Sequence, residues 1–132
     1  MSTFAESSLL IAAPPASSAD TVATVTGLGT GLIPEGKAWV TIESPNSAYI
    51  VTLPDAAVGA RIRGWIGANG AEVRTPALSG ETINSVDSDG TNQAALPATT
   101  YFEFERVTAT GWILKAWDEL GAVVGPIVPD AP

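Results

Sequence analysis

Apolar and polar residues alternate along three stretches between Tyr49 and Trp117, and this period of two constrains the fold more than any other feature. The stretches are residues 49–53, 61–66 and 101–107. Successive side chains of a β-strand point to opposite faces, so the alternation predicts half-buried strands rather than helices. Turn residues recur at intervals of roughly 8–12 residues, which is typical of antiparallel β proteins. We therefore expect an all-β fold, an antiparallel β-sandwich or barrel, with a jelly-roll-like arrangement possible.

The same pattern predicts the individual strands. One dipeptide, Asn69-Gly70, stands between two alternating segments and predicts a tight hairpin, because a primed turn needs positive φ at both central residues. One candidate helix longer than a turn covers residues 116–120. The strands are expected at residues 37–43, 48–53, 60–67, 71–75, 82–85, 92–96, 99–107 and 110–117.

Composition divides the chain into three zones. Residues 1–36 are poor in charge and rich in small residues and proline, with one strand candidate at 21–26, and predict an extended N-terminal arm. Residues 37–117 form the expected β-sandwich core domain. Residues 118–132 are expected to form an extended Pro-rich C-terminal tail with a possible strand at 122–124, because proline cannot donate a backbone hydrogen bond.

The 132 residues contain neither histidine nor cysteine, which excludes a Ser-His-Asp or Cys-His mechanism and thiolate metal sites. We expect a protein that is not an enzyme and has no cofactor. Fourteen acidic residues against six basic ones give a net charge of −8, which argues against nucleic-acid binding. No apolar run approaches the ~18 residues of a spanning helix, so no membrane partner is expected. Charged residues make up only 15% of the chain, which favours burial of surface against other copies.

Two acidic constellations carry alternative interpretations. The segment Asp87–Asn92 has the alternating oxygen ligands of a calcium loop, but Asp-Gly is also an ordinary turn, and the sequence leaves cation binding open. Glu103 and Glu105 share one face of a strand, at a spacing that glycosidase carboxylates also show. A solvated strand face explains this spacing better. Cross-strand partners for these glutamates are expected among Arg61, Arg63 and Arg106.

Four tryptophans suit either sugar stacking or packing in a core or subunit interface. In the alternating segments around Trp39 and Trp112 the inward position is the natural one, which favours packing. The apolar run at 9–11 is too hydrophobic for a plain linker and is expected to lie across a neighbouring surface. Our candidate interface residues are Leu9, Leu10, Ile11, Trp39, Trp117, Ile127 and Val128.

A set of short motifs across residues 48–117 resembles a small β module found in virion proteins of tailed bacteriophages. These proteins include capsid decoration (cement) proteins, head fibres and tail-fibre segments. The chain departs from common versions in a longer loop around residues 87–97. The motifs are Val51-Thr52-Leu53-Pro54-Asp55-Ala56, Gly59, Arg61-Ile62, Gly80-Glu81-Thr82-Ile83-Asn84, Tyr101-Phe102-Glu103-Phe104 and Gly111-Trp112-Ile113.

The resemblance implies a structural role on a phage surface, with Ile83 and Trp112 in the core. A single acidic module between an apolar arm and a Pro-rich tail suits a trimeric decoration protein. Such a protein would bind the major capsid protein on the capsid surface of the virion, after assembly in the host cytoplasm, and stabilise the phage head. The alternative is a head-fibre or tail-fibre module that binds a host surface glycan.

Overall fold

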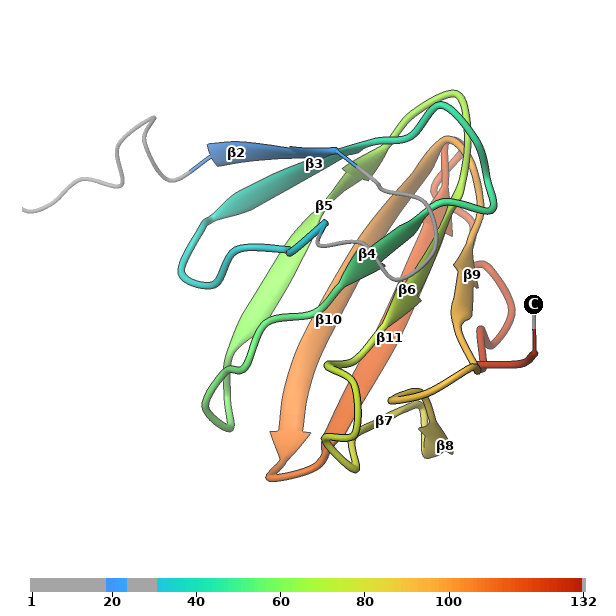
Figure 1. Cartoon of the computed structure of the whole chain (residues 1–132). Coiled ribbons are helices and arrows are strands. Elements are labelled where there is room, and N and C mark those ends of the chain that lie inside the picture. The colour runs from blue at the N-terminus through green and yellow to red at the C-terminus, as the bar shows by residue number, and fades with distance from the viewer. Residues whose placement is uncertain (1–18, 24–30, 132) are drawn as a thin grey trace, which may run out of the picture.

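The computed structural model describes residues 19–23 and 31–131, and these residues form strands and connections without any helix. They make two sheets, seven strands in a large sheet and three in a small one (Figure 1). In spatial order the large sheet contains β2 (Ala19–Ala23), β3 (Trp39–Glu43), β5 (Arg61–Ile66), β10 (Thr100–Thr108), β11 (Gly111–Asp118), β7 (Thr82–Ile83) and β8 (Val86–Asp87). The small sheet contains β4 (Ile50–Thr52), β6 (Ala71–Arg74) and β9 (Ala94–Leu96).

The predicted all-β class is confirmed, and two layers around one core are consistent with a β-sandwich. Each of the eight predicted core strands overlaps an observed strand. Prediction of a purely antiparallel fold was wrong in part. The pairs β10–β11 and β10–β5 are antiparallel, but β2–β3, β3–β5, β4–β6 and β11–β7 are parallel.

The connectivity explains the parallel pairs. From β3 to β10 the chain changes sheet after every strand or hairpin: β3, β5 and the β7–β8 hairpin lie in the large sheet, and β4, β6 and β9 in the small one. A chain that runs along one sheet and returns along the other brings β3 and β5, and likewise β4 and β6, into the same direction. The β7–β8 hairpin then reverses the chain, so β9 pairs with β6 antiparallel. β10 and β11 break this alternation, because they follow each other within the large sheet through the turn before Gly111.

The hairpin predicted at Asn69-Gly70 was wrong for the same reason. β5 and β6, on either side of it, belong to different sheets, so this turn carries the chain across the sandwich. Neither residue has positive φ. Asn69 Nδ2 donates to the Ser44 carbonyl at 3.0 Å. A Cβ on Gly70 would lie 2.3 Å from the Leu96 carbonyl oxygen, so glycine is required here by the close approach of β9 and not by φ.

The core lies between the sheets, where the inward residues of the alternating strands meet. Ile62, Phe102 and Phe104 of the large sheet are fully buried, and so are Val51 and Val73 of the small sheet. The two phenylalanine rings pack edge to face, 5.7 Å apart. Burial of an aromatic or branched side chain contributes about 1.5–3 kcal/mol, so this interior is the main source of stability. Ile83 and Trp112, both expected in the core, are fully buried.

Parts of the predicted arm and tail belong to the sandwich. β2 pairs with β3. Ile33 is fully buried, and its N–H donates a hydrogen bond to the Thr52 carbonyl at 2.8 Å. Near the other end, Asp130 exchanges two backbone hydrogen bonds with Gln93. The possible strand at 122–124 is reduced to a single antiparallel bridge between residues 117 and 123. Predictions on residues 1–18 lie outside the described residues.

The candidate helix at 116–120 does not form, because β11 continues to Asp118 and a turn follows. Ala116 keeps the period of two and points inward, opposite Phe102. The Asp118 carboxylate accepts hydrogen bonds from the N–H groups of Leu120 and Ala122, each at 2.9 Å. An aspartate that bonds its own following backbone closes a turn and competes with helix formation.

Candidate functional site

Four aromatic side chains lie together on the outer face of the large sheet, and we call them the aromatic band: Trp39 of β3, Trp65 of β5, Tyr101 of β10 and Trp117 of β11. Tyr101 stands directly opposite Trp65 in one strand pair and opposite Trp117 in the other. The ring centroids of Tyr101 and Trp117 are 5.1 Å apart, and those of Trp39 and Tyr101 are 5.9 Å apart. The inward position expected for Trp39 was wrong: Val40 and Ile42 occupy the inner face of β3, and Trp39 is 37% exposed, while the other three are half-buried. Aromatic rings in this setting stabilise the sheet and leave an apolar surface open to a partner.

Next to the aromatic band the same face carries cross-strand charges. Glu103 stands opposite Arg63 on one side and Lys115 on the other. Arg61 Nε lies 3.5 Å from Glu105 Oε1, as predicted, and both side chains are well exposed. An exposed pair of this kind contributes at most about 1 kcal/mol. The two glutamates are therefore flanked by cations on an open sheet face, which is the environment of solvated strand residues.

Arg106, the third arginine expected to pair with these glutamates, does not. It follows Phe102 and Phe104 on the inner face and is buried, with Nη1 3.3 Å from Glu81 Oε1. Its guanidinium lies 5.4 Å from the Trp112 ring centroid, and Trp112 Nε1 donates to the same Glu81 oxygen at 3.0 Å. Arg106 Nε also donates to the Thr108 carbonyl at 2.9 Å. A buried charge needs this kind of compensation, so the cluster is a structural one.

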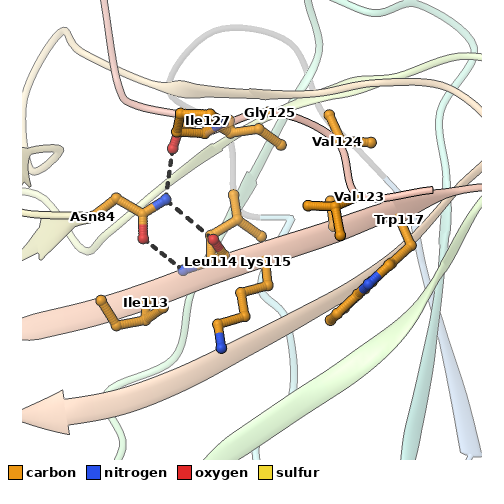
Figure 2. A pocket seen from close by; sticks show the side chains of 11 residues that line it. Asn84, Ile113, Leu114, Lys115, Trp117, Val123, Val124, Gly125 and Ile127 are labelled. Atoms are coloured by element: carbon orange, nitrogen blue, oxygen red, sulfur yellow. Dashed lines mark hydrogen bonds between the residues drawn. The ribbon is translucent and has the colours of Figure 1, made fainter.

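An apolar groove of about 510 Å³ runs beside β11, between this strand and residues 123–127, which we call the C-terminal segment (Figure 2). We call it the β11 groove. Trp117 and Val123 line one part of it and Ile127 another, while Lys115 is its charged member. Val123 is 74% exposed. The aromatic band reaches the groove through Trp117, so the two form one continuous apolar surface.

Asn84 holds the two walls of the β11 groove together (Figure 2). Its Oδ1 accepts a hydrogen bond from the Leu114 N–H at 2.9 Å, and its Nδ2 donates to the carbonyls of Leu114 at 3.1 Å and Ile127 at 2.7 Å. The side chain thus replaces a neighbouring strand along the edge of β11. Asn84 and Ser85 form the turn between β7 and β8, with φ of 49° and 69°. Asparagine tolerates this left-handed region better than most residues, and its three bonds fix it there.

The structure brings some of the predicted interface residues together. Trp117 and Ile127 line one groove, and Trp39 connects to Trp117 through Tyr101. Val128 is about half exposed but does not line the groove. Leu9, Leu10 and Ile11 lie outside the described residues. Sequence reasoning missed Tyr101 and Asn84; the outward position of Tyr101 in its alternating segment could have indicated the former, but no local signal indicates the bonds of Asn84.

The oxygens of the possible calcium loop bond backbone groups, one in the same turn and one in the turn before β7. Asp87 Oδ1 accepts from the Asp89 N–H at 3.1 Å, and Asp89 Oδ2 accepts from the Gly80 N–H at 2.6 Å. The hydrogen bond from the Asp89 backbone foremost lowers the pKa of Asp87. Across the described residues, no three acidic side chains cluster in a way that would hold a metal ion. The carboxylates act here as turn caps.

Among the described residues no helix has the length and hydropathy needed to span a bilayer. The sequence matches no family model, and neither curated proteins nor solved structures show significant similarity to it.

Proposed function

We propose that this protein is a structural virion component, a capsid decoration protein that forms homotrimers and binds the major capsid protein on the outer shell of a phage head. The observation that carries the proposal is the continuous apolar surface made by the aromatic band and the β11 groove. Tryptophan and tyrosine are enriched in protein interfaces, where one buried aromatic side chain can supply about 2 kcal/mol or more of binding energy. The motif resemblance of residues 48–117 supports the virion setting.

Charge distribution supports docking through the same face. Two of the six basic residues, Arg74 and Arg106, are buried. In the described part the other four gather on the outer face of the large sheet, where Arg63 and Lys115 flank Glu103. Arg61 and Lys37 line a shallow hollow with Arg63. Since the whole chain carries a net charge of −8, its remaining surface is strongly acidic. A face with cations beside aromatic rings is complementary to an acidic protein surface, including that of another copy.

The mechanism is mechanical and needs no chemistry. Binding across a seam between capsid subunits buries apolar surface on both sides, which raises the force needed to separate them. Ordering of any flexible segment costs conformational entropy, so each docked segment has to bury enough area to offset it. The sandwich supplies a rigid body on which the aromatic side chains are already positioned by cross-strand packing.

The first experiment measures self-association by size-exclusion chromatography with light scattering. We expect a trimer for the unchanged chain and a loss of trimer for a Trp39→Ser, Tyr101→Ser variant. Val58→Ser serves as the control, because Val58 is exposed on a loop outside the aromatic band. A stable monomer at high protein concentration would contradict the trimer.

The second experiment heats particles of the phage that carries the gene, prepared with and without the protein. We expect particles that contain the protein to release DNA at a higher temperature, and the Trp39→Ser, Tyr101→Ser variant to restore less protection than Val58→Ser. Equal heat resistance with and without the protein would argue against a role in the capsid.

A second candidate function is a head-fibre or tail-fibre module that binds a host glycan. The specific observation is a pair of shallow hollows, of about 270 and 180 Å³, that meet at Glu103 beside the aromatic band. Arg61 and Arg63 line the first and Lys115 the second, so an acidic sugar suits them best. Binding on a glycan array that is lost in Trp39→Ala would support this function, and a blank array would count against it.

A further inference from the structure

The β11 groove is an apolar surface that a partner has to cover. Val123 is 74% exposed, and the groove lining is formed mainly by apolar side chains, with Lys115 as the charged exception. Contiguous exposed apolar surface next to an aromatic band marks an interaction site. The hydrogen bonds of Asn84 to β11 and to the C-terminal segment fix the distance between the walls, so the groove is preformed.

The chain itself contains a segment with matching chemistry. The residues before β2 include the apolar run Leu9-Leu10-Ile11, and Glu6 is the sole charged side chain among residues 1–18. The sign of Glu6 is opposite to that of Lys115 at the groove. A short apolar segment preceded by one acidic residue therefore suits the groove in both hydrophobicity and charge.

Where this segment joins the sandwich decides which groove it reaches. The described residues begin at Ala19, the first residue of β2, which is the edge strand of the large sheet at the end away from β11, β7 and β8. Four strand spacings of about 4.8 Å separate β2 from β11, and the groove lies a further spacing beyond, so the path is about 24 Å even without rising over the side chains of the face. The eight steps from Ile11 to Ala19 span at most about 26–29 Å. The chain's own groove is thus reached only by a fully taut segment, whereas the groove of a second copy has no such limit.

We propose that residues Leu9–Ile11 of one copy occupy the β11 groove of a second copy. The inference rests on the proposed self-association and names one of its contacts, beside that of the aromatic band. Donor segment and acceptor groove are different surfaces of the same chain, so the contact is heterologous and closes into a ring when the rotation between copies permits. Three copies in such a ring would each donate one segment and receive one.

The absence of cysteine makes a direct test possible. Two single-cysteine chains, Leu10→Cys and Val123→Cys, are mixed, unfolded, refolded together and oxidised. We expect disulfide-linked dimers of the two chains in the mixture and at least tenfold fewer in either chain alone. Leu10→Cys mixed with Val58→Cys is the matched control, because Val58 is similarly exposed but lies on the loop before β5. Equal cross-linking in this control would overturn the proposal.

A chain that carries both Leu10→Cys and Val123→Cys distinguishes the two grooves. Cross-links between chains support the proposal. A link within one chain, with none between chains in the mixture, would show that the segment binds its own groove and would overturn it, as would the absence of any link.

A full-length variant with Leu9, Leu10 and Ile11 changed to serine separates this inference from the function on which it rests. We expect it to lose the trimer in light scattering while its thermal unfolding midpoint shifts by less than about 2 °C, since none of the changed residues belongs to the described strands of the sandwich. A variant that stays trimeric and still protects particles from heat would refute the groove contact alone. A wild-type chain that neither self-associates nor protects particles would instead refute the proposed function.

Discussion

The side chain of Asn84 offers the most direct test of how the edge of the large sheet is closed. Replacing it with glycine removes three hydrogen bonds, of 2.7 to 3.1 Å, and keeps a residue that accepts positive φ. The Leu114 N–H and the carbonyls of Leu114 and Ile127 then lose their partners. Asn84→Gly therefore measures the bonds with little contribution from backbone strain.

The expected magnitude follows from the number and setting of these bonds. Each contributes about 1 kcal/mol net, and the groups are only partly buried, so water can replace some of the loss. The greater freedom of glycine in the unfolded chain adds up to about 1 kcal/mol. We expect Asn84→Gly to lower the free energy of unfolding by about 3 kcal/mol. Asn84→Ala loses the same bonds and keeps a Cβ at positive φ without the local polar contacts that let asparagine adopt this region, so it should destabilise at least as much as Asn84→Gly.

The assay is equilibrium unfolding in urea, followed by the fluorescence of the four tryptophans. For a chain of this length a loss of 3 kcal/mol lowers the melting temperature by roughly 10 °C. Ser85→Gly is the matched control: Ser85 is the other turn residue at positive φ and is exposed, so this change should be neutral or stabilising. A loss below about 0.5 kcal/mol in Asn84→Gly, or an equal loss in Ser85→Gly, would refute the role of the side chain.

Three further predictions concern the core and its charges. Gly64→Ala should prevent stable folding, because the new Cβ would lie 1.6 Å from a carbonyl oxygen of β3. Thermal unfolding checks this. The control, Gly67→Ala, has open space around its Cβ position and should be nearly neutral. Glu81→Gln should destabilise the protein by about 3 kcal/mol in urea unfolding, because it leaves the buried charge of Arg106 without its carboxylate, and a neutral result would contradict this. Burial raises the pKa of Glu72, so the folded state binds the proton more tightly than the unfolded state. This group therefore lowers the free energy of unfolding as pH rises from the unfolded pKa through the folded pKa. Glu72→Gln should consequently be more stable than the unchanged chain at pH 7 and lose that advantage below about pH 4; a constant difference across this range would exclude the linkage.

The period of two predicted where the strands lie, because it records local alternation between a buried and an exposed face. It could not predict which strands pair. Asn69-Gly70 has the sequence of a hairpin turn, yet it joins β5 of one sheet to β6 of the other. The choice depends on contacts far along the chain, such as the approach of Leu96 to Gly70. Ala116 shows the same limit, since its pairing with Phe102 overrides a local preference for helix.

The candidate site was predictable to a similar degree. Trp39, Trp117 and Ile127 could be named as interface candidates because large apolar side chains in a small acidic domain suit an interface. Their convergence depends on Tyr101, which fills the space between two tryptophans from different strands. Asn84 lies outside the reach of a sequence pattern altogether, because its partners Leu114 and Ile127 follow 30 and 43 residues later.

Closure of the sheet edge and formation of the β11 groove have one cause. An open edge of β11 would offer unpaired backbone groups to any strand, which promotes unspecific association. A further strand in register would satisfy those groups but leave no space beside them. Asn84 instead bonds β11 at Leu114 through its side chain, while the C-terminal segment returns to β11 only near Ala116 and Asp118. Between these two attachments the tail stands away from the strand, and the groove opens there (Figure 2). The molecule thereby exchanges recognition through backbone hydrogen bonds, which accept almost any strand, for recognition through apolar side chains, which selects a partner by shape.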